Sequence, residues 1–196
     1  VMSSAMAYDL DEAFIRGTGA GQPTGLLNAP STISVAKDSG QAADTITFTN
    51  VLGMWQRMHP ACHKNAVWLI NPDCIAQIYQ MQWSGTSTTT PTFMPPATGM
   101  TQDPATTLMG RPIIWTEHAS ALGDQGDIIL ADWTQYAIGI RLPLTIQRSV
   151  HDSWLQDATD WRLIARIEGT PLLSAAITPR NGTNTLSWAV VLDERA

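Results

Sequence analysis

A glycine-rich loop is the first feature of this sequence that resembles a binding motif. The letters G-T-G-A-G-Q at residues 17–22 look like half of the fingerprint with which proteins bind dinucleotide phosphates. That fingerprint requires a strand before the glycines and a helix after them, because the positive end of the helix dipole faces the phosphates. Here a helical pattern precedes the glycines, and no Lys-Ser/Thr pair completes a P-loop. We therefore expect no nucleotide at this loop.

The same loop is better interpreted as a structural joint. Glycine reaches backbone angles that are closed to other residues and proline fixes its own, so together they hold one route out of a helix. The residues that we assign to this joint are Gly17, Gly19, Gly21, Pro23 and Gly25.

Four side chains in the first half of the sequence are good zinc donors. They are His59, Cys62, His63 and Cys74. A standard structural zinc site takes paired ligands from two knuckles, whereas Cys74 stands alone inside a predicted helix. We favour the alternative, in which the histidines are exposed near a helix end and the cysteines are small buried residues. We predict no metal site.

The remaining polar residues do not form a catalytic pattern. The chain lacks the Gly-x-Ser-x-Gly motif of a serine nucleophile. His118 and His151 each stand next to an acidic residue, but neighbours in sequence do not necessarily point their side chains at each other. Three carboxylates flank a turn and a strand and offer oxygen ligands for a cation: Asp124, Asp127 and Asp132. Aspartate is, however, common in turns for structural reasons. We therefore predict no enzyme and no cofactor.

Periodicity predicts the elements that position these residues. Apolar residues at helical spacing predict a helix that ends at Arg16, a second helix from Thr45 or Thr47 to His59, and a third that begins at Pro72 and extends through Gln82. Apolar or alternating runs predict strands over residues 32–35, 66–70, 112–116, 127–131, 137–140, 144–150, 161–168, 172–178 and 186–192. Residues 85–104 are rich in Thr and Pro and predict an exposed loop. The fold class is α+β.

The composition indicates a protein that buries part of its surface in contacts with neighbouring molecules. Only 14% of the 196 residues are charged, whereas eight are tryptophan, a residue enriched in interface cores. The alternative is that the tryptophans fill the protein's own core. A net charge of -6 disfavours a dedicated nucleic-acid binder. We find no pattern of a membrane span or signal peptide, and two cysteines suit a reducing intracellular setting.

Several segments resemble a known family in the same order along the chain. The run E-A-F-I-R-G-T-G-A-G-Q-P-T-G-L-L at residues 12–27 is similar to the segment that links the spine helix to the axial domain in tailed-phage major capsid proteins of the Hong Kong 97 type. G-R-P-I-I-W-T-E-H at 110–118, G-D-I-I-L-A-D-W-T-Q-Y at 126–136 and the strand-rich run 144–178 fit the same family.

This resemblance implies a division of the chain. Residues 1–28 would be the end of the spine helix and the joint, in the peripheral domain. Residues 29–143 would form the axial domain, 144–169 the β segment of the peripheral domain, and 170–196 a return to the axial domain with a C-terminal strand. In the family an N-terminal arm and an extended loop precede the spine helix. We therefore expect this chain to be a C-terminal portion that lacks both and does not close shells alone.

The resemblance also implies a function. Members of the family are structural head proteins that self-assemble, as pentamers and hexamers, into an icosahedral shell around phage or prophage DNA. The implied partners are copies of the chain, with scaffold, portal and head-maturation protease, and the implied location is the virion after assembly in the bacterial cytoplasm. We expect no sequence-specific nucleic-acid binding and no membrane. The alternatives are an encapsulin-like nanocompartment shell and a zinc- or ligand-binding enzyme domain.

Some capsid proteins of this type cross-link their subunits through a Lys-Asn isopeptide bond that a buried Glu promotes. The run W-L-Q-D at residues 154–157 matches the aromatic-x-x-Asn run of those members, but Asp157 takes the place of the Asn and Ile164 the place of the Glu. The lysine would lie in the extended loop. We predict no autocatalytic cross-linking.

Overall fold

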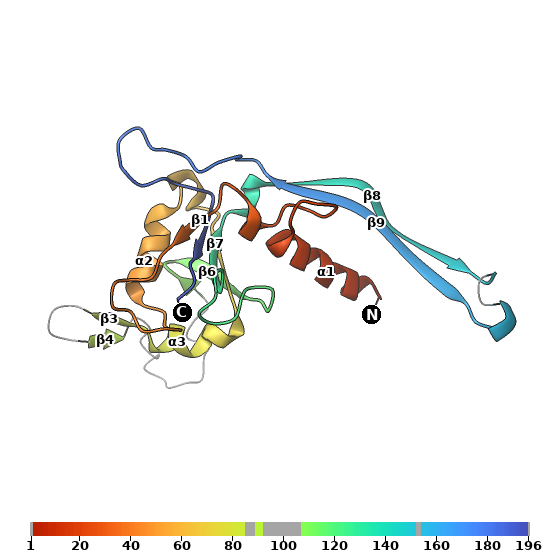
Figure 1. Cartoon of the computed structure of the whole chain (residues 1–196), viewed down its shortest axis with the longest axis horizontal. Helices are drawn as coiled ribbons and strands as arrows, with labels where there is room; N and C mark the ends of the chain where they lie inside the picture. The colour runs from red at the N-terminus through yellow and green to blue at the C-terminus, as the bar shows by residue number, and fades with distance from the viewer. Residues whose placement is uncertain (1, 85–88, 92–106, 152–153, 196) are drawn as a thin grey trace.

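The computed structural model describes residues 2–84, 89–91, 107–151 and 154–195. A lobe built on a six-stranded sheet carries a long two-stranded ribbon, and helix α1 lies beside the base of that ribbon (Figure 1). The helices are α1 (Met2–Arg16), η1 (Leu26–Asn28), α2 (Phe48–Arg57), η2 (Pro60–Cys62), η3 (Pro72–Cys74), α3 (Ile75–Gln80), η4 (Trp133–Gln135) and η5 (Trp154–Gln156). The strands are β1 (Ile33–Val35), β2 (Val67–Ile70), β3 (Gln82–Ser84), β4 (Thr89–Pro91), β5 (Thr107–Leu108), β6 (Arg111–Trp115), β7 (Ile128–Ala131), β8 (Tyr136–Ser149), β9 (Asp160–Pro171) and β10 (Ala189–Leu192).

The core of the lobe lies around a mixed sheet with the order β1-β10-β7-β2-β6-β5. β1 pairs with β10 and β2 with β6 in parallel, while β7 is antiparallel to both β10 and β2. All residues of β7 and β10 are buried, which explains why these strands are continuous apolar runs rather than alternating ones. Trp68 of β2 is fully buried, and its indole donates a hydrogen bond of 2.9 Å to the Leu108 carbonyl. The strands predicted at 66–70, 112–116, 127–131 and 186–192 are confirmed.

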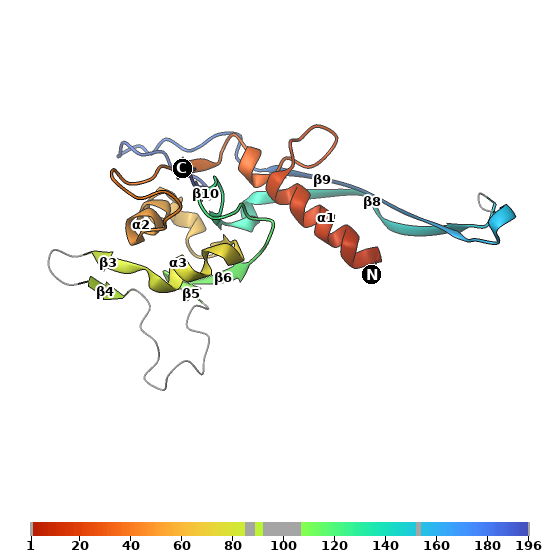
Figure 2. The same ribbon diagram turned by 60° about the horizontal axis from the view of Figure 1, so that its bottom comes forward.

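Helix α2 of the lobe follows its prediction closely. Thr47 is the N-cap of α2, where its hydroxyl accepts from the Asn50 amide and the Asn50 side chain accepts in return from the Thr47 amide. α2 packs against β1 and β10, and it buries Val51 and Met54. Leu52 of the same helix is 45% exposed and lies outside this buried face. α2 and α3 are seen together with the β3–β4 hairpin in Figure 2.

Two predictions near α3 were wrong. η3 begins at Pro72 and leads into α3, but α3 ends at Gln80, and Gln82 already belongs to β3. Within the predicted loop 85–104, residues 89–91 form β4, which pairs antiparallel with β3. The consecutive residues Thr89 and Thr90 suit this strand, because β-branched side chains favour extended backbone. The rest of that predicted loop lies outside the described residues.

The ribbon is one hairpin rather than a series of short strands. Residues 137–140 and 144–150 were predicted as two strands, but β8 runs without a break from Tyr136 to Ser149 and pairs antiparallel with β9 along its length. The register shifts between Ile140 and Thr145, and Pro143 lies inside this irregular stretch. A bulge accommodates proline, which has no amide to donate to the ladder. β8 therefore crosses the boundary that the family resemblance placed between residues 143 and 144.

The segment after the ribbon also differs from its prediction. β9 ends at Pro171, and residues 172–178 do not form the predicted strand. Ile177 makes an isolated antiparallel bridge with Leu186, with amide-to-carbonyl hydrogen bonds of 2.7 and 2.8 Å. None of the described helices is long and apolar enough to cross a membrane.

A buried ion pair fastens the last described residues to the core. The side chains of Arg195 and Asp127 are fully buried and form a salt bridge. Arg195 also donates to the Thr45 carbonyl at 2.8 Å, and the Gly123 amide donates to Asp127 at 3.1 Å. The pair is thus surrounded by the further hydrogen bonds that a buried charge needs.

Removing one partner of this pair should destabilise the lobe strongly. Asp127→Asn leaves the Arg195 guanidinium buried without a countercharge, which costs about 3–5 kcal/mol in comparable cases. Urea unfolding monitored by tryptophan fluorescence measures the loss. Asp124→Asn, in the neighbouring turn, is the matched control and should change the free energy of unfolding little. Equal effects of the two substitutions would contradict this role of the pair.

Candidate functional site: the elbow between helix, lobe and ribbon

The elbow, residues 17–25, begins where α1 ends. The Gly17 amide donates to the Ala13 carbonyl at 2.9 Å, which closes the last turn of the helix. The Asn28 side chain then donates to the carbonyls of Arg16, at 2.8 Å, and Gly17, at 3.2 Å. The Arg16 carbonyl, at the helix C-terminus, has no intrahelical partner, so this side chain caps it. The elbow is therefore continuous with a well-capped helix end.

The two ends of the elbow touch through their backbones. The Gly25 amide donates to the Gly17 carbonyl at 2.8 Å, and Thr18 and Thr24 form an antiparallel bridge. A Cβ atom at Gly25 would collide with the Gly17 nitrogen and with the carbonyl group of Ile15. A Cβ atom at Gly17 would collide with the Pro23 carbonyl oxygen. Glycine is required at both ends because the chain crosses itself there.

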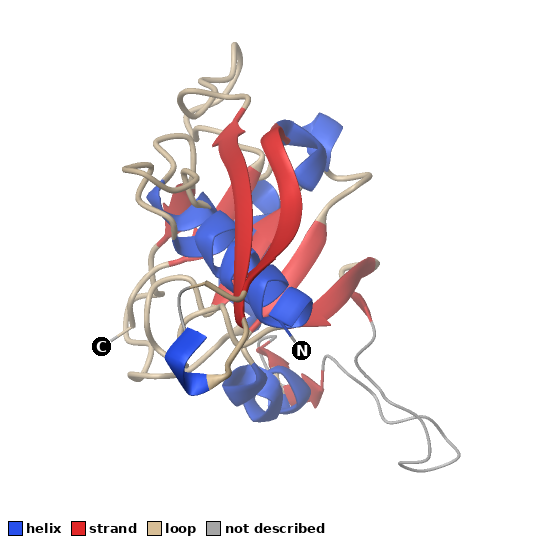
Figure 3. Ribbon diagram, turned by 90° about the vertical axis from the view of Figure 1, so that its right-hand side faces the viewer, coloured by secondary structure: helices blue, strands red, loops and turns tan. Residues whose placement is uncertain are grey.

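The elbow is attached to the base of the ribbon. The Thr24 amide donates to the Gly169 carbonyl of β9 at 2.8 Å, and the Tyr136 hydroxyl donates to the Thr24 carbonyl at 2.8 Å. The phenol of Tyr136 lies against Gly169, where a Cβ atom would collide with it. Burial, followed by the charge of Glu168, raises the pKa of Tyr136 to about 12, so the hydroxyl stays a donor. Figure 3 shows α1 beside the two ribbon strands.

The end of α1 is attached to the lobe as well. Arg16 donates from Nε to the His118 carbonyl at 2.9 Å and from its terminal nitrogen to the Ser120 hydroxyl at 3.0 Å. Glu12, one turn earlier, contacts Nδ1 of His118 at 2.9 Å. Ile15 is buried at the same helix end. Helix, lobe and ribbon therefore meet at the elbow.

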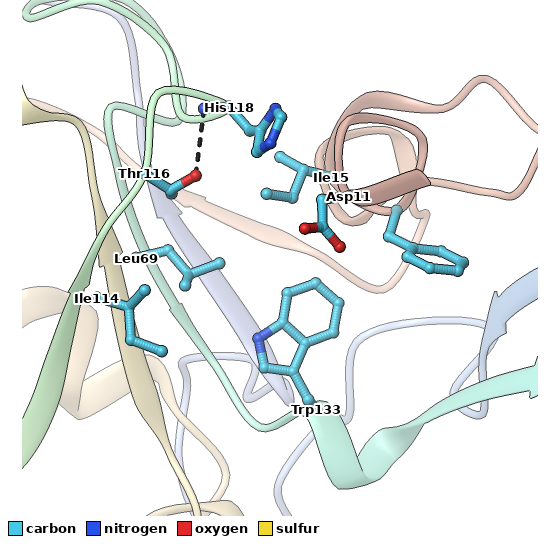
Figure 4. Close-up of a pocket in the computed structure, with 8 residues that line it drawn as sticks. Asp11, Ile15, Leu69, Ile114, Thr116, His118 and Trp133 are labelled. Atoms are coloured by element: carbon cyan, nitrogen blue, oxygen red, sulfur yellow. Dashed lines mark hydrogen bonds between the residues drawn. The ribbon is translucent and has the colours of Figure 1, made fainter. Parts of the chain in front are cut away.

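A small apolar cavity of about 250 Å³ separates α1 from the sheet of the lobe. Figure 4 shows Asp11 and Ile15 of α1 on one side and Trp133, Leu69 and Ile114 on the other. The cavity is also lined by Phe14, Thr116 and His118. The cavity therefore interrupts the packing between this part of α1 and the lobe.

Comparison with known proteins identifies the family. The family model described as "Phage capsid family" matches residues 1–181. The chain belongs to the phage capsid family. A search of curated protein sequences found no match for this capsid chain.

Solved structures share the fold of the capsid chain at low sequence identity. The capsid of an empty GTA particle has a TM-score of 0.70 at 16% identity, over 100% of this chain and 64% of that one. The Gordonia phage Cozz structure has a TM-score of 0.62 at 16% identity, over 100% and 61%. The SrpI encapsulin complex from Synechococcus elongatus PCC 7942 has a TM-score of 0.58 at 16% identity, over 98% and 62%. The Hong Kong 97-type fold expected from the sequence is therefore confirmed, and the chain spans less than two thirds of these neighbours.

All residues assigned to the joint lie in the elbow of the capsid chain, but they differ in environment. Gly17 and Gly25 meet, and Pro23 is buried beside them. Gly19 and Gly21 have φ values of +78° and +73°, and a Cβ atom at Gly21 would meet no neighbour. Sequence reasoning missed Tyr136 and Gly169, because their contacts with Thr24 span more than a hundred residues and leave no local pattern. It also missed the nearby Asn28, which caps the end of α1.

The glycine loop of the capsid chain does not have the geometry of a phosphate site. It receives the C-terminal end of α1, where the helix dipole is negative. The next element, η1, is a three-residue 3₁₀ helix.

The four zinc-donor candidates of the capsid chain are engaged elsewhere. Nδ1 of His59 accepts from the Ala61 amide, and the His63 ring packs edge-on against Trp55. Cys62 and Cys74 are buried free thiols in η2 and η3, which lie before and after β2. Within the described ranges, no three His, Cys, Asp or Glu side chains are grouped to hold a metal ion.

The other candidate residues have structural roles or lie at the ribbon. Asp127 pairs with Arg195, and Asp132 caps η4 by accepting from the Thr134 amide. His151 is exposed at the ribbon tip, and its neighbour Asp152 lies outside the described residues. The residues considered for cross-linking, Asp157 and Ile164, lie after η5 and within β9, and the absence of cross-linking stays a prediction.

Two substitutions in the elbow should distinguish a glycine that is required for lack of space from one that is required for its backbone conformation. Gly25→Ala places a methyl group against the backbone of Gly17 and should cost about 3 kcal/mol or more. Gly21→Ala only imposes a left-handed conformation on alanine and should cost about 1–2 kcal/mol. Chemical denaturation of both variants measures the difference. A larger loss for Gly21→Ala would contradict the close crossing of the chain.

The cysteines should be unreactive in the folded chain. Burial is the main cause that raises the pKa of the Cys62 thiol to about 11, and the charge of Asp132 is the second cause. Burial likewise raises the pKa of the Cys74 thiol to about 12, with the charge of Asp127 as the second cause. Thiols stay protonated below a raised pKa, so at about pH 8 the thiolate fraction falls by roughly a hundredfold or more relative to a free thiol. Modification by a chromogenic disulfide should therefore be slow until denaturant is added, when both thiols react. Rapid reaction in native buffer would contradict this.

Proposed function

We propose that this chain is part of a structural major capsid protein that self-assembles into an icosahedral shell around phage or prophage DNA. The match of residues 1–181 to the phage capsid family carries the proposal. The likeness to solved capsids supports it through the fold. The chain then works through its surfaces, as a tile without catalytic function.

The ribbon provides one surface that suits contact between copies. β9 is the regular strand, and its alternate residues Trp161, Leu163, Ala165 and Ile167 form one apolar face. Residues paired across the ribbon share a face, which adds Ile138, Ile140 and Ile146 of β8, with Arg148 opposite Trp161 at the outer end. We call this set the apolar ribbon face.

The apolar ribbon face is largely exposed in a single chain. Four of its residues are more than half exposed: Ile138 (54%), Ile140 (64%), Ile146 (56%) and Trp161 (56%). The opposite face carries the charged residues Arg162, Arg166 and Glu168 together with Ile164, and is therefore the more polar of the two. A contiguous apolar surface on one side of a projecting hairpin is favourable to bury against another molecule. We assign a second copy of this protein as its occupant, because the family builds shells.

The elbow then serves as the joint that keeps the ribbon, α1 and the lobe in fixed positions within each tile. Gly17, Gly19, Gly21, Pro23 and Gly25 are its residues. We propose that residues 1–28 and 144–169 act as peripheral domain and that 29–143 with 170–196 act as axial domain. The hydrogen bonds from Thr24 to Gly169 and from Tyr136 to Thr24 support a firm joint.

The full protein would form pentamers and hexamers in the virion after assembly in the bacterial cytoplasm, with scaffold, portal and head-maturation protease as partners. Weak contacts suffice in such a shell, because many identical ones act together. A nanocompartment shell is the second candidate, supported by the encapsulin neighbour, whose TM-score of 0.58 is below the 0.70 of the GTA capsid.

Two neighbouring substitutions on β8 test the proposed contact. Ile146→Glu puts a charge on the apolar ribbon face, whereas Gln147→Glu puts the same charge on the opposite face, across from Arg162. Sedimentation velocity across a concentration series should show association of the wild-type chain and of Gln147→Glu. Ile146→Glu should remain monomeric. A chain that is monomeric at every concentration, or two variants that associate equally, would contradict the proposal.

A further inference from the structure

Helix α1 contacts the lobe through a stripe of polar side chains that the shell-forming role does not explain. Tyr8, Glu12 and Arg16 are spaced by four residues and therefore lie on one face of the helix. All three contact the segment 117–120, which leads from β6 toward β7. We call these contacts the latch.

Each residue of the stripe has a defined partner in this segment. Tyr8 hydrogen bonds to Glu117, which raises the pKa of the phenol, and its ring packs on the His118 imidazole with centroids 4.4 Å apart. Glu12 contacts Nδ1 of His118 at 2.9 Å. Arg16 holds the His118 carbonyl and the Ser120 hydroxyl. His118 is thus the residue on which the contacts converge.

The outer turns of α1 depend on the latch because they are not packed into the core. Every side chain from Ser3 to Phe14 is described, and none of them is fully buried. Ile15 is buried only in the final turn, next to the elbow. The cavity beneath Asp11 further separates the helix from the sheet. The elbow therefore fixes the end of the helix, and the latch orders the turns before it.

We propose that the latch is a pH-sensitive device, in which protonation of His118 tightens the outer turns of α1 against the lobe through the Glu12 carboxylate. Imidazole is the side chain that gains its charge in mildly acidic solution. Its 8% exposed side chain leaves the ion pair with Glu12 less screened than a surface pair. The latch works within one chain and does not depend on assembly.

The charged and titratable groups near His118 come from α1 and from its own segment. Glu12 contacts its ring, Asp11 lines the same cavity, and Glu117 precedes it in the segment and hydrogen bonds to Tyr8. Arg16 binds the His118 carbonyl and also pairs with Glu12 at 3.5 Å, and the phenol of Tyr8 packs on the imidazole. As the pH rises and the imidazole becomes neutral, the ion pair is reduced to an ordinary hydrogen bond and the outer turns loosen.

Hydrogen exchange of the α1 amides at residues 5–12 tests the latch in this chain. After correction for the chemical exchange rate of an unstructured peptide, protection should be roughly two- to fivefold greater at about pH 5.5 than at about pH 8. His118→Gln keeps a polar side chain that does not titrate, and Glu12→Gln removes the carboxylate. Both variants should abolish the pH dependence.

Matched controls separate the latch from general effects of pH. Asp9→Asn removes a charge from the same helix without touching the Glu12–His118 contact and should retain the wild-type pH dependence. Amides of β7 and β10 report global stability and should not change between the two conditions. Equal protection of α1 at both pH values in the wild type, or a pH dependence that survives in His118→Gln, would overturn the proposal.

Discussion

The close crossing of the backbone at Gly17 and Gly25 is the constraint on which the arrangement of this chain depends. Because these residues have no side chains, the Gly25 amide reaches the Gly17 carbonyl at 2.8 Å directly after the end of α1. The chain then leaves the elbow in a direction that brings Thr24 to Gly169 at the base of the ribbon. One local contact therefore positions three parts of the molecule relative to one another.

The lobe supplies a stable support for that arrangement. Its three central strands are buried except for the partly exposed Val67, and the Arg195–Asp127 pair fastens the last described residues to this core. The ribbon, by contrast, projects from the lobe, and Ile138, Ile140, Ile146 and Trp161 on its apolar face are each more than half exposed. A firm support and an uncovered projection are the properties that a protein needs if it binds copies of itself at a distance from its own core.

Much of this fold was predictable from local pattern, and the failures have identifiable causes. Buried strands such as 66–70 and 127–131 were found because a short apolar run between turn residues has few other solutions. The break predicted within β8 at Pro143 was wrong because a bulge in an isolated hairpin tolerates proline. The strand predicted at 172–178 was wrong because an apolar run forms a strand only where a partner lies beside it.

The candidate site was predictable in part. A helix followed by several glycines and a proline indicated a defined turn that includes Gly17 and Gly25, and in the structure the backbones of these two residues meet. Tyr136 and His118 could not be assigned their contacts, because nothing in the sequence shows that residues more than a hundred positions away will face α1 or the elbow. The resemblance to a capsid family gave the overall arrangement but not these side-chain contacts.

Amide exchange at Thr24 and Gly25 tests most directly whether the elbow is a firm junction. If it is, these two amides should be protected nearly as well as those of Leu130 and Val190 in the central sheet, because the elbow would open only when the lobe unfolds. Exchange at the rate of an ordinary surface loop, while the central sheet stays protected, would show that the elbow opens freely and would contradict the account.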